Sequence, residues 1–274
     1  DPQPDVIALQ EIDALSVRSV LGRARGREKR GEPVSNFDRF CASLNQASQE
    51  RNGHTYRAVF YPAQGHTGSG LPLYSTGLAI LSRDTLTQVE HNGDDPLDIT
   101  HRRIARLSRL KQKRICAWSR FLDDDGAAFD FFNTHLSLPA FLQRASGPTG
   151  GRFGESDNQV HEIETLLNFV HERGILDRTV LVGDFNALPG SRVYNTVSSR
   201  LRDAHATFLR APPDTMIGMP SAGFMNLRYR LDHVFSGTDI RFHDFHDTAP
   251  YGSQHPWVSL SDHAPLVGRF SVTT

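Results

Sequence analysis

The chain has 274 residues, of which 38% are hydrophobic and 22% are charged, a composition typical of globular proteins. A chain of this length can bury a large core without a disulfide or a structural metal. No apolar run approaches the roughly 18 residues of a membrane-spanning helix, so we expect no transmembrane segment. The formal net charge of -1 argues against a protein that binds nucleic acid through bulk positive charge, so any site for a polyanion must be local.

Basic residues gather in two stretches of the sequence. We interpret each stretch as solvated loop surface, with an electrostatic rim around an anionic substrate as the alternative. The first stretch holds Arg18, Arg23, Arg25, Arg27, Lys29 and Arg30, and the second holds Arg102, Arg103, Arg106, Arg109, Lys111, Lys113 and Arg114.

The sequence marks the cellular compartment only faintly. Cys41 and Cys116 are too few for a zinc site or a disulfide framework, and their spacing leaves open whether they pair. The first ten residues contain neither the basic nor the apolar region of a signal peptide. We favour a cytoplasmic location, with a secreted or periplasmic location as the alternative if a leader is missing.

Short apolar, β-branched runs recur along the chain, with turn-forming residues between them. Their lengths and composition are typical of strands. The segment "LDDDGAA" indicates a hairpin turn, whereas the Gly-, Ser- and Pro-rich stretches 62–76 and 144–155 indicate loops. In chain order, we expect strands at residues 5–10, 56–61, 77–82, 114–121, 129–136, 179–184, 230–235 and 265–270.

The segment "ESDNQVHEIETLLNFVHERG" predicts a helix. Apolar residues recur in it at helical spacing from Val160 to Val170 and form one apolar face. We expect Ser156 to cap its N-terminus and Gly174 to end it. A second, weaker helix is expected around residues 37–44.

Strands outnumber helices in this pattern. Two sheets packed face to face, with helices outside, fit it better than one doubly wound sheet. We therefore expect an α/β (α+β) chain that forms a single domain over residues 1–274 and acts as a monomer.

Polar residues that can carry chemistry recur at one kind of place, the end of an apolar strand. Carboxylates, an amide and imidazoles that converge there would suit metal-assisted hydrolysis of a phosphoester, with Mg²⁺ or Mn²⁺ bound by oxygen. Each residue alone has a simpler explanation as a cap, a turn former or a structural histidine. All of them together, in their order, favour the catalytic interpretation. They are Glu11, His135, Asp184, Asn186, Asp232, Asp262 and His263.

The same residues lie in a series of short motifs. In chain order these are "DVIALQE", "GLAILSR", "NTHL", "GDFNALPGS", "RLDHVF" and "SDHAPL". The series resembles the motifs of the endonuclease/exonuclease/phosphatase superfamily, which includes deoxyribonucleases, apurinic endonucleases, neutral sphingomyelinases and inositol polyphosphate 5-phosphatases. The resemblance implies a four-layer sandwich of two mixed β-sheets with helices outside. It also implies a preceding strand that carries a metal-side Asn, so we expect that the first core strand is missing.

The resemblance implies roles around a metal ion and a phosphate. Glu11 matches the glutamate that binds the divalent metal, Mg²⁺ or Mn²⁺, and Asp262 matches a metal-side carboxylate. Asn186 matches the amide that holds a phosphate oxygen. His135 matches the histidine that contacts the phosphate or assists the leaving group.

Other residues match the groups that prepare the attacking water. His263 matches the histidine often assigned as general base, with Asp232 as its orienting carboxylate. Asp184 matches the aspartate that positions or deprotonates the water, so the roles of Asp184 and His263 could be exchanged. A carboxylate beside the imidazole should raise the pKa of His263 above that of an isolated side chain.

These residues predict a divalent-metal-dependent hydrolase of phosphoester bonds, either a phosphodiesterase or a phosphatase. One alternative is a nuclease acting on DNA or RNA, and another, of a different class, is a non-catalytic binding module that keeps the scaffold. The substrate would be nucleic acid or a phospholipid or inositol phosphate head group. The sequence does not choose among them, because loops make that choice in such folds and these loops carry no recognisable motif.

Overall fold

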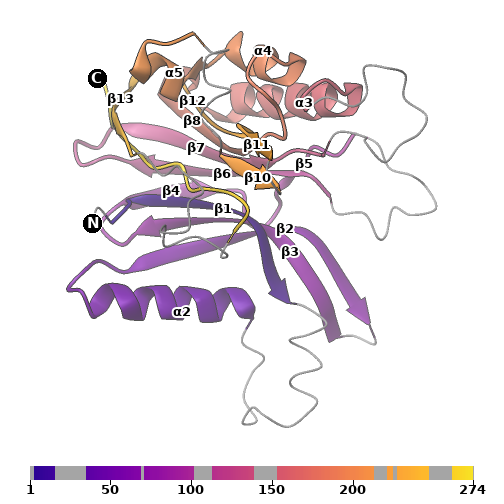
Figure 1. The fold of residues 1–274 in the computed structure, drawn as a ribbon. Coiled ribbons are helices and arrows are strands. Elements are labelled where there is room, and N and C mark those ends of the chain that lie inside the picture. The colour runs from indigo at the N-terminus through magenta and orange to yellow at the C-terminus, as the bar shows by residue number, and fades with distance from the viewer. Residues whose placement is uncertain are drawn as a thin grey trace.

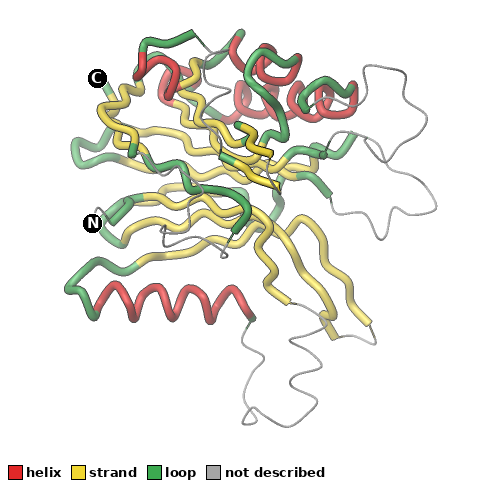
Figure 2. Tube along the Cα trace, viewed as in Figure 1, coloured by secondary structure: helices red, strands yellow, loops and turns green. Residues whose placement is uncertain are grey.

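The structure, a computed structural model, arranges helices and sheets in four layers (Figure 1). A three-stranded sheet and a seven-stranded sheet pack face to face, with α2 outside the smaller sheet and α3 and α4 outside the larger one. Figure 2 shows the same layers coloured by secondary structure. The expected sandwich is therefore confirmed. The structure describes residues 3–15, 35–68, 71–101, 113–138, 153–212, 221–224, 227–246 and 261–273.

Helices and strands are unevenly distributed along the described residues, with most helices in the second half of the chain. The helices are α2 (Asn36–Gln49), α3 (Asp157–Arg173), α4 (Arg192–Ser198) and α5 (Ala204–Leu209), with a 3₁₀ helix, η1, at Leu176–Arg178. The strands are β1 (Val6–Leu15), β2 (Tyr56–Gly68), β3 (Leu71–Arg83), β4 (Thr87–His91), β5 (Leu97–Asp98), β6 (Ile115–Leu122), β7 (Ala128–His135), β8 (Thr179–Asp184), β9 (Arg202–Asp203), β10 (Ala222–Phe224), β11 (Leu227–Tyr229), β12 (Asp232–Ser236), β13 (Ile240–Phe245) and β14 (Gly268–Val272).

All eight expected strands have a counterpart, but the loop expected at residues 62–76 is wrong. The described residues of this range, 62–68 and 71–76, belong to β2 and β3, which pair antiparallel down to Gly68 and Leu71. Gly and Pro suggested a loop there. The ladder accommodates them through register shifts between Pro62 and Gln64 and between His66 and Thr67, as bulges do elsewhere in sheets.

The two expected helices are confirmed. Ser156 accepts a hydrogen bond from the backbone of Gln159 and caps α3, which ends at Gly174 as expected. Ser35 caps α2 through a reciprocal pair of hydrogen bonds with Asp38. Among the described residues, no helix is both long enough and apolar enough to cross a bilayer.

Several expected features lie largely outside the described residues. They are the loop at 144–155 and the basic stretches at 18–30 and 102–114, of which only 153–155, Lys113 and Arg114 are described. Both cysteines are described and both are free thiols.

Several strands of the larger sheet begin or end at the same end of the sheet. Its order is β4-β6-β7-β8-β12-β9, with β5 paired to β6. β7 and β8 run parallel, so they end side by side, and β12 begins at the same end because it runs antiparallel to β8. The core between the two sheets includes Phe131 of β7, whereas Phe132 packs under the helices, as the alternation of side chains along a strand requires.

Candidate active site

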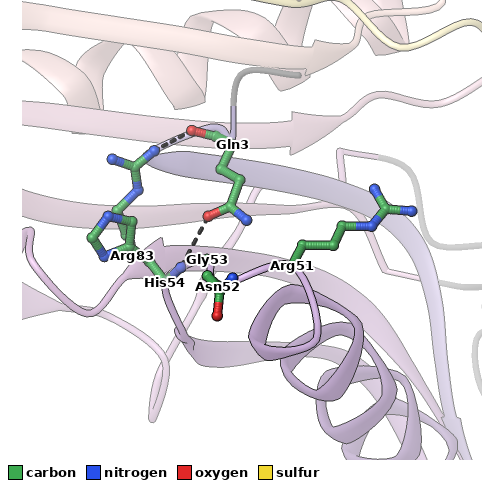
Figure 3. A pocket seen from close by; sticks show the side chains of 6 residues that line it. All are labelled: Gln3, Arg51, Asn52, Gly53, His54 and Arg83. Atoms are coloured by element: carbon green, nitrogen blue, oxygen red, sulfur yellow. Dashed lines mark hydrogen bonds between the residues drawn. The ribbon is translucent and has the colours of Figure 1, made fainter.

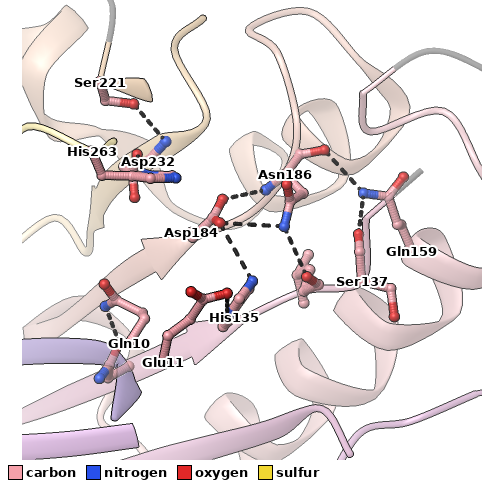
Figure 4. A network of polar contacts seen from close by, with 12 residues as sticks. Gln10, Glu11, His135, Ser137, Gln159, Asp184, Asn186, Ser221, Asp232 and His263 are labelled. Atoms are coloured by element: carbon pink, nitrogen blue, oxygen red, sulfur yellow. Dashed lines mark hydrogen bonds and ion pairs between the residues drawn. The ribbon is translucent and has the colours of Figure 1, made fainter. Parts of the chain in front are cut away.

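Three polar side chains lie in one row across the larger sheet, at the ends of three neighbouring strands. His135 ends β7, Asp184 ends β8 and Asp232 begins β12. The ladder pairs His135 with Asp184 and Asp184 with Asp232. His135 Nε2 lies 3.4 Å from Asp184 Oδ2 (Figure 4). Strand pairing alone thus brings together residues that are far apart in the sequence.

The turn after β8 holds the Asp184 carboxylate from two sides. The backbone N–H of Asn186 donates to Asp184 Oδ1 at 2.9 Å, and the Asn186 side-chain amide lies 3.3 Å from Oδ2. The same amide donates to the Leu136 carbonyl at 3.0 Å. Asn186 has a φ of 47°, a conformation that Asn tolerates better than most residues. Asn186 therefore orients Asp184 here, and the phosphate contact implied by resemblance stays a prediction.

His263 and Asp232 form a close pair. His263 Nδ1 lies 2.7 Å from Asp232 Oδ2. The Ser221 segment holds both residues, because Ser221 Oγ accepts from the backbone of Asp232 and a bridge joins Ala222 to His263. The hydrogen bond to Asp232 raises the pKa of His263 to about 9 against the opposing effect of burial. The expected direction of this shift is confirmed.

The neighbouring titratable groups move in different directions. Burial, followed by the charge of Asp232, raises the pKa of Asp184 to about 7. Burial, with help from the positive charges of Arg114 and His263, lowers the pKa of His135 well below its usual value. His135 is therefore a neutral imidazole near neutral pH, and its contacts with carboxylates are not ion pairs.

The smaller sheet contributes Glu11 to the site. Glu11 Oε1 lies 3.9 Å from His135 Nδ1, and the Glu11 side chain is 75% exposed. Asp262 is also exposed, next to His263, and its charge contributes to the raised pKa of that histidine. Six of the seven expected residues thus lie together around the ends of β7 and β8 and the start of β12, and Asp262 lies next to this group.

The donor set at Glu11 fits a weakly held divalent cation. No three His, Cys, Asp or Glu side chains of the described residues are grouped to hold a metal. One accessible carboxylate, completed by water and a substrate phosphate, is nevertheless a common way to bind Mg²⁺. Joint binding by Glu11 and Asp262 stays a prediction.

One cation near the site was not singled out from the sequence. Arg114 directly precedes β6, and its Nε is buried without a hydrogen-bond partner among the described residues. Burial lowers the pKa of Arg114, whereas the charges of Glu162, Asp184 and Glu11 oppose that effect. Its place beside an apolar strand distinguishes it from the rest of its basic stretch, and this was the available signal.

The start of α3 supports the turns after β7 and β8. Gln159 is fully buried, and its side-chain amide donates to the carbonyls of Ser137 at 2.8 Å and Asn186 at 2.9 Å. Glu162 accepts from the backbone N–H of Ser137 at 2.9 Å and from its hydroxyl at 2.6 Å. The sequence shows these residues only as polar positions of a helix.

A hollow lies away from this site, beside Gln3, which precedes β1 (Figure 3). Arg83, which lines it, pairs with Asp5 at 3.0 Å and hydrogen-bonds the Gln3 carbonyl. His54 lies 3.5 Å from Asp84. Arg51, which also lines it, is exposed, whereas Arg83 and His54 already have acidic or carbonyl partners. We therefore assign no ligand to this hollow.

The family model of the endonuclease/exonuclease/phosphatase family matches residues 1–263. The chain therefore belongs to this family, whose members hydrolyse phosphoester bonds. A comparison with curated proteins finds no match.

Several solved structures share the fold. The catalytic domain of human Nocturnin with a bound sulfate anion has a TM-score of 0.59 and 19% identity, over 99% of this chain and 82% of that one. ANGEL2, a 2',3'-cyclic phosphatase, in complex with adenosine-2',3'-vanadate, has a TM-score of 0.58 and 15% identity, over 98% and 82%. An endonuclease/exonuclease/phosphatase from Bacteroides vulgatus has a TM-score of 0.52 and 14% identity, over 85% and 90%. At identities this low, the structural similarity shows a common fold and nothing more.

Proposed function

We propose that this protein is a divalent-metal-dependent hydrolase of phosphoester bonds. The observation that carries the proposal is the row of His135, Asp184 and Asp232 at one end of the sheet, extended by the 2.7 Å contact between Asp232 and His263. This arrangement combines the Asp184 carboxylate, which has a pKa of about 7, with the protonated imidazole of His263. Family membership supports the same reaction class.

The pKa values favour Asp184 over His263 as the base. A general base works best when its pKa lies near the working pH. Asp184 meets this condition, whereas His263, with a pKa of about 9, holds its proton at pH 7. We infer that Asp184 takes the proton of the attacking water while the new P–O bond forms and the ester P–O bond breaks. The departing oxygen takes the electron pair of the broken bond and a proton from solvent, and leaves as an alcohol. The imidazolium of His263 then stabilises the charge that develops on the phosphoryl oxygens.

Two further groups suit the phosphate. Arg114 carries a positive charge with an unused buried N–H, and a guanidinium pairs well with phosphate oxygens. Neutral His135 can donate one hydrogen bond without adding charge. A divalent ion held by Glu11 would polarise the phosphoryl group.

The substrate class is best sought among diesters and nucleotides. ANGEL2 shares the fold and is described as a 2',3'-cyclic phosphatase, so a cyclic nucleotide is a sensible probe. Nucleic acid, sphingomyelin and inositol phosphates are the other probes that the family suggests. A binding module that lacks catalysis remains the alternative of a different class.

The experiment is a hydrolysis assay with Mg²⁺ or Mn²⁺. Bis-p-nitrophenyl phosphate tests diesterase action, p-nitrophenyl phosphate tests phosphatase action, and the natural probes follow. Asp184→Asn should abolish metal-dependent turnover, whereas Asp124→Asn, in the exposed turn between β6 and β7, should leave it unchanged. The absence of metal-dependent turnover on every probe would favour the binding module.

A further inference from the structure

The backbone of β1 is irregular where it presents Glu11. Its pairing with β3 shifts between Leu9 and Ile12, and Glu11 has a φ of 55°. A non-glycine residue rarely adopts this left-handed conformation, and when it does so near a functional site the surrounding structure must hold it there. The bulge turns Glu11 toward His135, so whatever holds the bulge also places the carboxylate.

One buried amide of the larger sheet reaches this bulge. Asn133 of β7 is fully buried, and its Nδ2 donates to the carbonyls of Leu9 at 3.0 Å and Ala79 at 3.2 Å. Its Oδ1 accepts from Gln10 Nε2 at 2.7 Å. Leu9 and Ala79 are register partners in β1 and β3, so Asn133 joins both strands beside the bulge.

The same strand carries a catalytic candidate next to this amide. Asn133 and His135 are two residues apart on β7, so both point toward the smaller sheet. Figure 4 shows Glu11 between Gln10 and His135. The apolar contacts between the two sheets are non-directional, so on their own they do not fix the position of one sheet relative to the other. The directed hydrogen bonds from Asn133 to the smaller sheet can fix this relative position.

We propose that Asn133 and Gln10 are positioning residues that set Glu11 of the smaller sheet against His135 and Asp184 of the larger sheet. The proposal rests on the proposed function in taking Glu11 as the carboxylate for the divalent ion. A purely structural cross-link would stabilise the sandwich without affecting the ion.

The test compares two Gln→Met variants of the full chain. Gln10→Met removes the hydrogen bond to Asn133 at nearly constant volume. Gln88→Met is the matched control, because Gln88 is also half-buried and donates to Ser119 at 2.8 Å across the ladder of β4 and β6. Calorimetric titration with Mn²⁺ should show a dissociation constant raised by about tenfold or more in Gln10→Met, the usual effect of losing a group that orients a metal ligand. Gln88→Met should bind Mn²⁺ like the wild type.

A double-mutant cycle shows whether Gln10 acts through Glu11. In a Glu11→Gln background, Gln10→Met should cause no further loss of Mn²⁺ affinity. When Glu11→Gln itself weakens Mn²⁺ binding, equal losses in both backgrounds, or an unchanged affinity in Gln10→Met, would overturn the proposal.

Crystal structures of the wild type and Gln10→Met provide a readout that needs no metal. Glu11 should leave its left-handed conformation or move away from His135 in the variant. An unmoved Glu11 would overturn the positioning role. If Glu11→Gln binds Mn²⁺ like the wild type, the metal assignment fails instead, and the crystal structures alone decide the positioning role.

Discussion

At the residue scale, the site pairs two groups whose pKa values define a working pH range. Asp184 must lose its proton to act as a base, with a pKa of about 7, and His263 must keep its proton, with a pKa of about 9. The rate should therefore rise through about pH 7 and fall through about pH 9. Asp232→Asn removes the carboxylate that raises the pKa of His263, so the alkaline limb should move to lower pH and the maximal rate should fall.

The measurement is a pH profile of kcat/KM, which reports the pKa values of the free enzyme, for the wild type, Asp232→Asn and His263→Ala. His263→Ala should lower kcat by roughly a hundredfold, the usual cost of losing one group that stabilises transition-state charge. A rate that continues to rise through pH 9 in the wild type would return the role of base to His263.

The buried Asp184 carboxylate should lower stability. Its pKa is raised from 3.8 to about 7, so the folded state binds a proton that the unfolded state has already released. The free energy of unfolding should therefore fall as pH rises through this range and stay lower above it. In EDTA, Asp184→Asn should raise the melting temperature relative to the wild type more at pH 8 than at pH 4, while it abolishes turnover. A variant that melts below the wild type at pH 8 would contradict this account.

Arg114 should act mainly on binding of the phosphate. Arg114→Met removes the charge but keeps much of the buried apolar length. A hydrogen bond to a charged group contributes about 1.5–3 kcal/mol, so KM and the inhibition constant of inorganic phosphate should rise by about tenfold or more. Lys113→Met is the control, because the neighbouring Lys113 is half-exposed and pairs with Asp98 at 3.4 Å. Equal effects of the two variants would show that Arg114 contributes only bulk charge.

At the element scale, the close approach of β7 and β8 depends on Gly183. Gly183 has a φ of 145°, and a Cβ there would lie 2.0 Å from the Thr134 carbonyl oxygen. Gly183→Ala would push the two strands apart between His135 and Asp184. We expect a loss of about 1–3 kcal/mol in stability from overpacking, together with loss of turnover. Gly190→Ala is the control, since Gly190 also has positive φ but faces open space. Thermal melting and kcat of both variants provide the comparison.

The same scale explains what the sequence could and could not predict. Strand ends are visible as apolar runs that stop at Asp184 or His135, and parallel pairing then brings the two residues together. The bulge at Glu11 is invisible, because it depends on Asn133, a residue of the other sheet. Arg114 is visible only as the basic residue beside an apolar strand, since tertiary packing decides which cation is buried and which is solvated.

At the scale of the whole molecule, the resemblance in the motifs predicted the layers because it covers both sheets. The extension of β2 and β3 into residues 62–76 was missed because the Gly and Pro residues there are typical of loops when they are considered locally. Pairing between long strands outweighs such local preferences. The substrate could not be predicted for a different reason, since it is chosen by loops rather than by the geometry of the strand ends.

The site spans both sheets, so its ligands should stabilise the sandwich as a unit. Glu11 comes from the smaller sheet, whereas His135 and Asp184 come from the larger one. A ligand present at a hundredfold excess over its dissociation constant adds about 2.7 kcal/mol, which corresponds to a rise of about 5–10 °C in the melting temperature of a chain of this size. Mn²⁺ together with inorganic phosphate should raise the melting temperature more than either alone, because the ion and the phosphate complete each other's coordination. Glu11→Gln should lose the Mn²⁺-dependent part of this rise, and EDTA should abolish both that part and the turnover of the wild type. The same Mn²⁺-dependent rise in Glu11→Gln, measured by thermal melting, would place the ion elsewhere.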